Sequence, residues 1–201
     1  MKKLLLSIIS SAVATASLSS LAGERVGDFA LIDHLGAQHH MAWYDDQQAV
    51  VIVPQAVGAT DAATLEVLIK LQSKYQDRDV VFFMMNPGLQ SDREAVAADL
   101  AKYGIELPVL MDDTHLVTEL LGIERMDEAV VYDPSSFELV YRGPVVAAAE
   151  AAIDRLLVGE NADLVSAVGS AKLISSNISD HTNLSYTKDI APIIASNCAT
   201  C

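Results

Sequence analysis

The chain has 201 residues, of which 27 are acidic and 13 are basic, so its formal net charge at pH 7 is −14. This excess of negative charge argues against nucleic acid and anionic lipid as partners and predicts a well solvated surface. The length suits one domain of ordinary size with an appendage, and an apolar content of 51% is ample for a core.

Residues 1–22 have the features of a secretory signal peptide. Lys2 and Lys3 precede an uncharged stretch of apolar and small residues, and Ser20 and Ala22 fit the small-residue rule for cleavage. The stretch is too short and too polar to favour a membrane span. We therefore expect cleavage after Ala22 and a secreted, periplasmic protein without membrane insertion.

Between residues 27 and 157 the sequence alternates short apolar runs with longer amphipathic ones. The runs at 49–54 and 80–86 are apolar without alternation, which suits central strands covered on both faces. The expected strands are 29–33, 49–54, 80–86, 107–112, 129–133 and 138–142. The expected helices are 60–75, 91–104, 114–122 and 145–159. This order predicts an α/β fold with a mixed sheet and helices on both faces.

Local signals mark the ends of several of these elements. Thr60 is expected to cap the first helix, and Ser91 with Glu94 forms a capping box before the second. Gly104 is the expected C-terminal stop of that second helix. The turn "DPSS" at 133–136 joins two strands with period-two patterning, which predicts a hairpin.

Residues 160–185 lose this periodicity and are rich in Ser, Asn, Ala and Asp. Such a composition predicts an extended linker. The sequence thus divides into a signal peptide at 1–22, a domain at 23–159, a linker at 160–185 and a terminal segment at 186–201.

The domain resembles a known superfamily in the strings "VVFFMMN", "IELPVLMDDTHLVTELLGI", "EAVVYDP" and "LVYRGPV" and in the order of its elements. It is similar to the thioredoxin-fold redoxins of the alkyl hydroperoxide reductase and thiol-specific antioxidant superfamily over residues 26–158. The resemblance implies a thioredoxin-like three-layer sandwich. It also implies other redox domains or proteins as partners.

The thiol site of that superfamily does not carry over to this sequence. Redoxins place the catalytic Cys after the first central strand, where the start of a helix lowers the thiol pKa. Gly58, Ala59 and Thr60 occupy that position here. Asp127 stands where the family has a cis-proline facing the thiol, and Ser170 stands where some related domains keep a further Cys. The resemblance therefore implies a degenerate site without thiol catalysis.

The terminal segment "YTKDIAPIIASNCATC" resembles the opening helix of a c-type cytochrome domain. The matching residues are Tyr186, Asp189, Ile190, Pro192, Ile193, Asn197, Cys198 and Cys201. The resemblance implies that Cys198 and Cys201 bind haem c covalently through its vinyl groups, and that a His following Cys201 ligates the iron. We expect the parent chain to continue into this haem domain.

Three other interpretations of "CATC" remain open. The pair could be a redox dithiol, although such motifs normally open a helix inside the thioredoxin fold. It could be half of a zinc site that needs two further ligands. In an oxidising compartment it could close into a small disulfide, which is favoured if Cys201 is the natural end.

His34, His39 and His40 form the one local group of histidines, and a copper or zinc site completed by Met41 or Asp45 is an alternative to a surface turn. Adjacent histidines point to opposite faces of a strand, so the surface turn is favoured.

Other polar and apolar residues have simpler expectations. We expect His115 to be exposed at a helix start, and Asp112 and Asp113 to act as caps there. The residues expected in the core include Trp43, Tyr44, Phe82, Phe83, Met84 and Met85.

The sequence as a whole predicts an exported redoxin-like domain that lacks the peroxidatic Cys and belongs to a periplasmic electron-transfer protein with a c-type haem module. One alternative is an active thiol oxidoreductase or peroxidase that uses Cys198 and Cys201. The other is a noncatalytic binding module that needs no haem.

Overall fold

A computed structural model describes residues 23–59, 62–88, 92–145, 147–160, 163–174 and 185–197. The expected signal peptide lies outside the described residues, as do Thr60, Ser91, Cys198 and Cys201.

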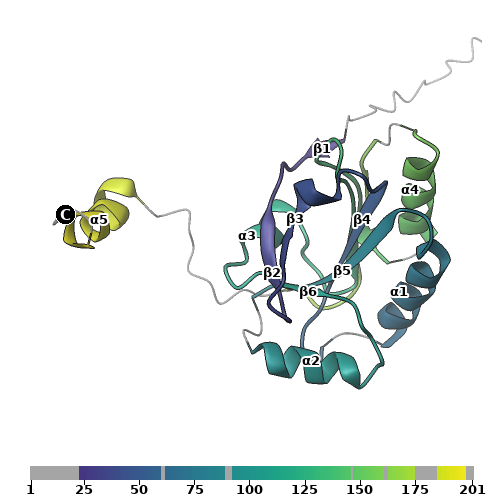
Figure 1. Cartoon of the computed structure of the whole chain (residues 1–201), viewed down its shortest axis with the longest axis horizontal. Helices are drawn as coiled ribbons and strands as arrows, with labels where there is room; N and C mark the ends of the chain where they lie inside the picture. Colours follow the sequence, from purple (N-terminus) through teal and green to yellow (C-terminus); the bar gives the residue numbers. More distant parts are fainter. Residues whose placement is uncertain are drawn as a thin grey trace, which may run out of the picture.

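The domain is built on one mixed sheet with the order β1-β8-β7-β4-β5-β6-β2-β3, and β9 pairs with β8 (Figure 1). The strands are β1 Glu24–Arg25, β2 Ala30–Asp33, β3 Gln38–His40, β4 Ala49–Pro54, β5 Val80–Asn86, β6 Val109–Met111, β7 Glu128–Asp133, β8 Glu138–Pro144 and β9 Val165–Ser166. The central strands β4, β5 and β6 run parallel, whereas β7 and β8 form the antiparallel hairpin that "DPSS" predicts. The expected strands at 49–54 and 80–86 are confirmed with their bounds.

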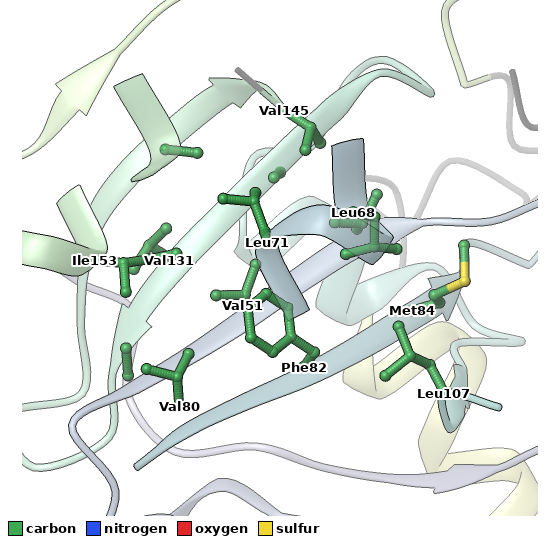
Figure 2. Packing of buried hydrophobic residues seen from close by; sticks show 14 of the residues in the cluster. Val51, Leu68, Leu71, Val80, Phe82, Met84, Leu107, Val131, Val145 and Ile153 are labelled. Atoms are coloured by element: carbon green, nitrogen blue, oxygen red, sulfur yellow. The ribbon is translucent and has the colours of Figure 1, made fainter. Parts of the chain in front are cut away.

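Helices cover both faces of this sheet. They are η1 Met41–Tyr44, α1 Ala62–Tyr75, α2 Arg93–Ala101, α3 Leu116–Leu120 and α4 Ala147–Leu157. Successive residues of β4 point to opposite faces, as the pleat requires. Val51 packs in a cluster with residues of α1, α2 and α4, which includes Leu68, Leu71 and Ile153 (Figure 2). Ile52 packs in the second cluster with residues of η1 and α3. The expected three-layer arrangement is confirmed.

The start of α2 differs from the expected capping box. The helix is capped by Asp92, whose Oδ1 accepts hydrogen bonds from the N–H groups of Glu94 at 2.9 Å and Ala95 at 3.2 Å. The expectation that Ser91 caps this helix is wrong. A carboxylate satisfies two free N–H groups and also interacts favourably with the helix dipole, which explains the shift by one residue. Gly104, with a φ of 65°, follows the end of α2 as expected.

The segment between β2 and β4 is more regular than the sequence predicts. Residues 38–40 form strand β3 instead of a surface turn, and η1 follows it directly. The single turn of η1 buries Met41 and leaves Trp43 58% exposed, so the expectation that Trp43 belongs to the core is wrong. Tyr44 is half-buried, and the other expected core residues named with it are buried.

Part of the expected linker belongs to the folded domain. Strand β9 at Val165–Ser166 pairs in parallel with Tyr141 and Arg142 of β8. Leu173 forms an isolated antiparallel bridge with Arg125. The expectation of a linker is therefore wrong for residues 163–174. The free backbone groups along β8 provide the pairing, and such an edge accepts an extended segment whatever its side-chain pattern.

Candidate functional site

The parallel strands β4, β5 and β6 end at one edge of the sheet, called here the carboxyl edge. The register places Pro54 beside Met85 and Asn86 beside Met111. Gln55, Asn86 and Asp112 lie at these strand ends and are buried. Ligands of open α/β sheets bind outside the carboxyl ends of the strands, so this edge is the candidate location of a functional site.

The loop after β4 holds the residues that the redoxin resemblance aligns with a catalytic thiol. Gly58 adopts a φ of 68°, and the N–H of Ala59 donates to the carbonyl of Ala56 at 3.0 Å, so the chain turns tightly here. Neither Gly58 nor Ala59 carries a nucleophile, and the two cysteines of the chain are at 198 and 201. Because a thiolate is the attacking group in thiol redox chemistry, the described part of this loop cannot perform it.

Asp99 of α2 is the buried carboxylate behind this loop. Its oxygens accept hydrogen bonds from Gln55 Nε2 at 3.3 Å, from Lys102 Nζ at 3.1 Å and from the N–H of Gly58 at 3.4 Å. Gln55 Oε1 in turn accepts from Asn86 Nδ2 at 3.3 Å. The carboxylate is thus engaged by three donors, which suits a structural anchor of the loop more than a free general base. Sequence reasoning missed this network.

Asp127 and Ser170, the two other positions that the resemblance singles out, are in contact. Asp127 Oδ2 accepts hydrogen bonds from the N–H of Ser170 at 2.8 Å and from its Oγ at 3.4 Å. Asp127 directly precedes β7, in which Val130 lies opposite Ile52 of β4. None of the described peptide bonds is cis, including those of the loop before β7.

The extended segment 169–174, called here the strap, covers the loop that leads to Asp127. The N–H of Met126 donates to the carbonyl of Lys172 at 3.2 Å, and the N–H of Ile174 donates to the carbonyl of Glu124 at 2.8 Å. Arg125 Nη1 donates to the carbonyl of Ala171 at 2.9 Å. The backbone edge of residues 124–126 is therefore already paired within the chain.

The three expected histidines do not converge on one point. His34 Nδ1 accepts from the N–H of Val109 at 3.1 Å, and His40 Nε2 lies 2.7 Å from Asp28 Oδ2. His39 Nε2 donates to Asp33 Oδ2 at 3.0 Å, and its Nδ1 lies 2.7 Å from the hydroxyl of Tyr44. Within the described ranges no group of three or more His, Cys, Asp or Glu residues is arranged to hold a metal ion.

The hydrogen bond from His39 helps to lower the pKa of the Asp33 carboxyl group. Burial by itself would raise the pKa of Asp33, but hydrogen bonds from His39 and from the N–H groups of Ala37 and Leu35 outweigh it and hold the pKa below the ordinary value of 3.8. A carboxyl group with a depressed pKa contributes stability that is present when the pH is above its ordinary pKa and is lost as the pH falls through its pKa in the folded protein.

Asp33→Asn should therefore flatten the fall in the free energy of unfolding below about pH 4. Urea unfolding between neutral and acid pH tests this, with Asp163→Asn on the surface as the control, and equal profiles for both variants would contradict it.

Asp112 and His115 shape the start of α3. Asp112 Oδ2 accepts from the N–H and from the Oγ1 of Thr118, both at 2.7 Å, so its carboxylate satisfies an N–H of the first turn, whereas the N-cap position itself is held by His115. His115 was expected to be exposed, and this is wrong, because the residue is only 8% exposed. It adopts a φ of 61° and its Nδ1 donates to the carbonyl of Pro87 at 2.9 Å. The left-handed backbone turns the ring inward, which the sequence gives no means to foresee.

The terminal segment forms η3 Tyr186–Ile190 and α5 Ala191–Asn197. Ile190, Ile193 and Ile194 are 39%, 59% and 44% exposed. Their spacing puts them on one face of the helix, so an apolar face is uncovered immediately before Cys198.

No protein-family model matches this chain, and no curated protein matches its sequence. Solved structures do match it. A hypothetical protein from Sinorhizobium meliloti 1021 aligns with a TM-score of 0.62 at 22% identity, covering 76% of this chain and 93% of that one. The thioredoxin domain of a thiol-disulfide oxidoreductase from Bacteroides vulgatus aligns with a TM-score of 0.55 at 13% identity, covering 68% and 97%. The chain has a thioredoxin-like fold.

A peroxidoxin, BcpB from Mycobacterium tuberculosis, shares this thioredoxin-like fold with a TM-score of 0.52 at 18% identity, over 69% of this chain and 97% of that one. At these identities the likeness concerns the fold alone. The α/β class expected from the sequence is therefore confirmed. In the described part of this thioredoxin-like chain, every helix is too short or too polar to span a bilayer.

Proposed function

We propose that this chain supplies an exported, thiol-free redoxin-type domain to a periplasmic electron-transfer protein with a c-type haem module. The observation that carries the proposal is the loop after β4, where Gly58 and Ala59 stand in place of a nucleophile. The nearby carboxylate of Asp99 is engaged by donors from three residues. The domain then contributes binding and positioning, with other redox domains or proteins as partners.

The residues of the terminal segment fit a covalently bound haem c. Ile190, Ile193 and Ile194 provide an uncovered apolar face that suits an apolar macrocycle. Cys198 and Cys201 have the spacing at which two thiols bind one haem. The group supplies one-electron transfer when bound. Cys198 and Cys201 would hold the group through their two sulfurs, and the isoleucine face would keep water from one side of it.

Export and periplasmic location are part of the same proposal. Lys2, Lys3 and the small residues up to Ala22 support it, because they have the order of a cleaved signal peptide. Haem attachment through cysteines is compatible with such a compartment.

The absence of thiol catalysis is tested by peroxide turnover. Residues 23–201 and the variant Cys198→Ser/Cys201→Ser should both consume hydrogen peroxide at the rate of the blank in the presence of a dithiol reductant, because neither has a thiol at the start of α1. Turnover by the unchanged chain that disappears in the variant would replace the proposal with a peroxidase that uses Cys198 and Cys201. Metal-independent turnover that survives in the variant would contradict a degenerate site.

A further inference from the structure

A second concave site lies between α3 and the strap, away from the loop after β4. This cleft has a volume of about 400 Å³, and its lining includes His115, Glu119, Ile123, Glu124, Leu173 and Ile174. Helix α3 lies on the face of the sheet opposite α1 and α4 (Figure 1). None of the residues that line the cleft belongs to the Asp99 network or to the terminal segment.

His115 supplies a buried hydrogen-bond acceptor to the cleft. A carbonyl can only accept, so the bond of 2.9 Å between Nδ1 and the carbonyl of Pro87 fixes the proton of the neutral ring on Nδ1. Nε2 then carries the lone pair, and no described residue forms a hydrogen bond to it. The residue is 8% exposed and lines the cleft, and Nε2 is the ring atom left to accept a hydrogen bond there.

Two carboxylates lie at the same cleft without a cation beside them. Within the described residues, neither Glu119 nor Glu124 forms an ion pair with a Lys, Arg or His side chain. The negative charge of these two residues is therefore not neutralised by the described part of the chain itself.

Four backbone donors around the cleft are already used. The N–H of Gly122 donates to the carbonyl of Glu119 at 3.0 Å, and the N–H of Ile174 donates to the carbonyl of Glu124 at 2.8 Å. The N–H of Ile123 donates to the carbonyl of Thr118 at 3.1 Å, and that of Glu124 donates to Glu128 Oε2 at 2.8 Å. The side-chain atoms that remain to bind a ligand, Nε2 of His115 and the carboxylate oxygens of Glu119 and Glu124, are acceptors.

We propose that this cleft binds an alkylammonium ion, the group carried by a lysine side chain or by a free diamine. An ammonium group has three donors and a positive charge, which match one neutral ring nitrogen and two carboxylates. Its alkyl stem matches the apolar wall of Ile123, Leu173 and Ile174. A bare metal ion suits the cleft less well, because the acidic and histidine side chains of the cleft are not among any metal-binding group within the described ranges. This site is independent of the proposed haem module.

Titration of residues 23–201 with n-butylammonium chloride, followed by NMR, tests the proposal. We expect saturable shifts of Ile123, Leu173 and His115 that sodium chloride does not cause. Glu119→Gln/Glu124→Gln should weaken binding about tenfold or more, because two charge-assisted hydrogen bonds become neutral ones. Glu106→Gln/Glu160→Gln, which removes the same charge elsewhere, should leave the dissociation constant unchanged. His115→Asn, which tolerates a positive φ, should also weaken binding while the remaining spectrum stays folded.

Two further titrations distinguish the sources of the ammonium group. A short peptide with one lysine that binds, and that fails to bind once its lysine is Nε-acetylated, supports a partner protein. A diaminobutane that binds more tightly than the peptide supports a free diamine. Absence of saturable shifts with every amine, equal weakening by both double variants, or binding of zinc without binding of butylammonium would overturn the proposal.

Discussion

Asp112→Ala is expected to lower the free energy of unfolding by about 3 kcal/mol, as removal of a charged acceptor from two buried donors does. Asp112 and Thr118 are both fully buried, and Asp112 Oδ2 accepts two hydrogen bonds of 2.7 Å from Thr118. The variant would leave the N–H and the hydroxyl of Thr118 in the core without this acceptor.

The neighbouring residue gives a matched control. Asp113 carries the same side chain one position later but is exposed, so Asp113→Ala should leave the unfolding free energy almost unchanged. Urea unfolding with equal m-values measures both variants. A loss for Asp112→Ala no larger than for Asp113→Ala would show that water replaces the carboxylate and that α3 does not depend on it.

Replacing both Cys198 and Cys201 with Ser is expected to abolish covalent haem attachment in the full-length protein. Each thiol forms one of the two thioether bonds that the motif provides, and serine cannot replace either. The protein with both cysteines, expressed with cytochrome maturation machinery, should retain haem absorbance after acid-acetone extraction, and the double variant should lose all of it.

Substitutions between the two cysteines control for the effect of introducing a serine at this end of the chain. Ala199→Ser and Thr200→Ser keep the spacing of the thiols and should keep the haem. Retention of haem by Cys198→Ser/Cys201→Ser after extraction would show that the group is held elsewhere, and absence of haem from every form would favour a binding module.

The centre of the fold could be predicted from local pattern because burial on both faces leaves a clear signal. Strands β4 and β5 are uninterrupted apolar runs, and their observed bounds coincide with the expected ones. The hairpin of β7 and β8 follows from "DPSS", whose Asp133 Oδ1 accepts from the N–H of Ser135 at 2.8 Å. Such short-range features need no tertiary information.

The margins of the sheet could not be predicted in this way. Strands β1 and β9 have two residues each, and they are strands only because the backbone of β8 pairs with them. Their side chains are exposed, so no apolar pattern marks them. The strap could not be predicted either, because it pairs with a loop far away in the sequence. Arg125 and Ala171, which are joined by a hydrogen bond, are 46 residues apart.

The absence of a thiol from the loop after β4 could be predicted from the sequence, but the polar network around Asp99 could not. Aligning the sequence with the redoxins is enough to show that Gly58 and Ala59 stand at the position of the thiol. Gln55 and Asp99 are 44 residues apart, and Gln55 and Asn86 are 31 apart, so their contacts depend on how α2 packs against the sheet. One signal was present in hindsight, because Asp99 lies between Val96 and Leu100 on the buried side of α2.

The codon that follows Cys201 in the natural gene tests the proposed haem-bearing redoxin protein most directly. We predict that it encodes His, because the motif places the residue that would ligate the iron immediately after its second thiol. A stop codon, or any residue other than His in a chain that continues, would contradict the haem module. Either result would leave a thioredoxin-like binding domain with a thiol pair that carries no haem.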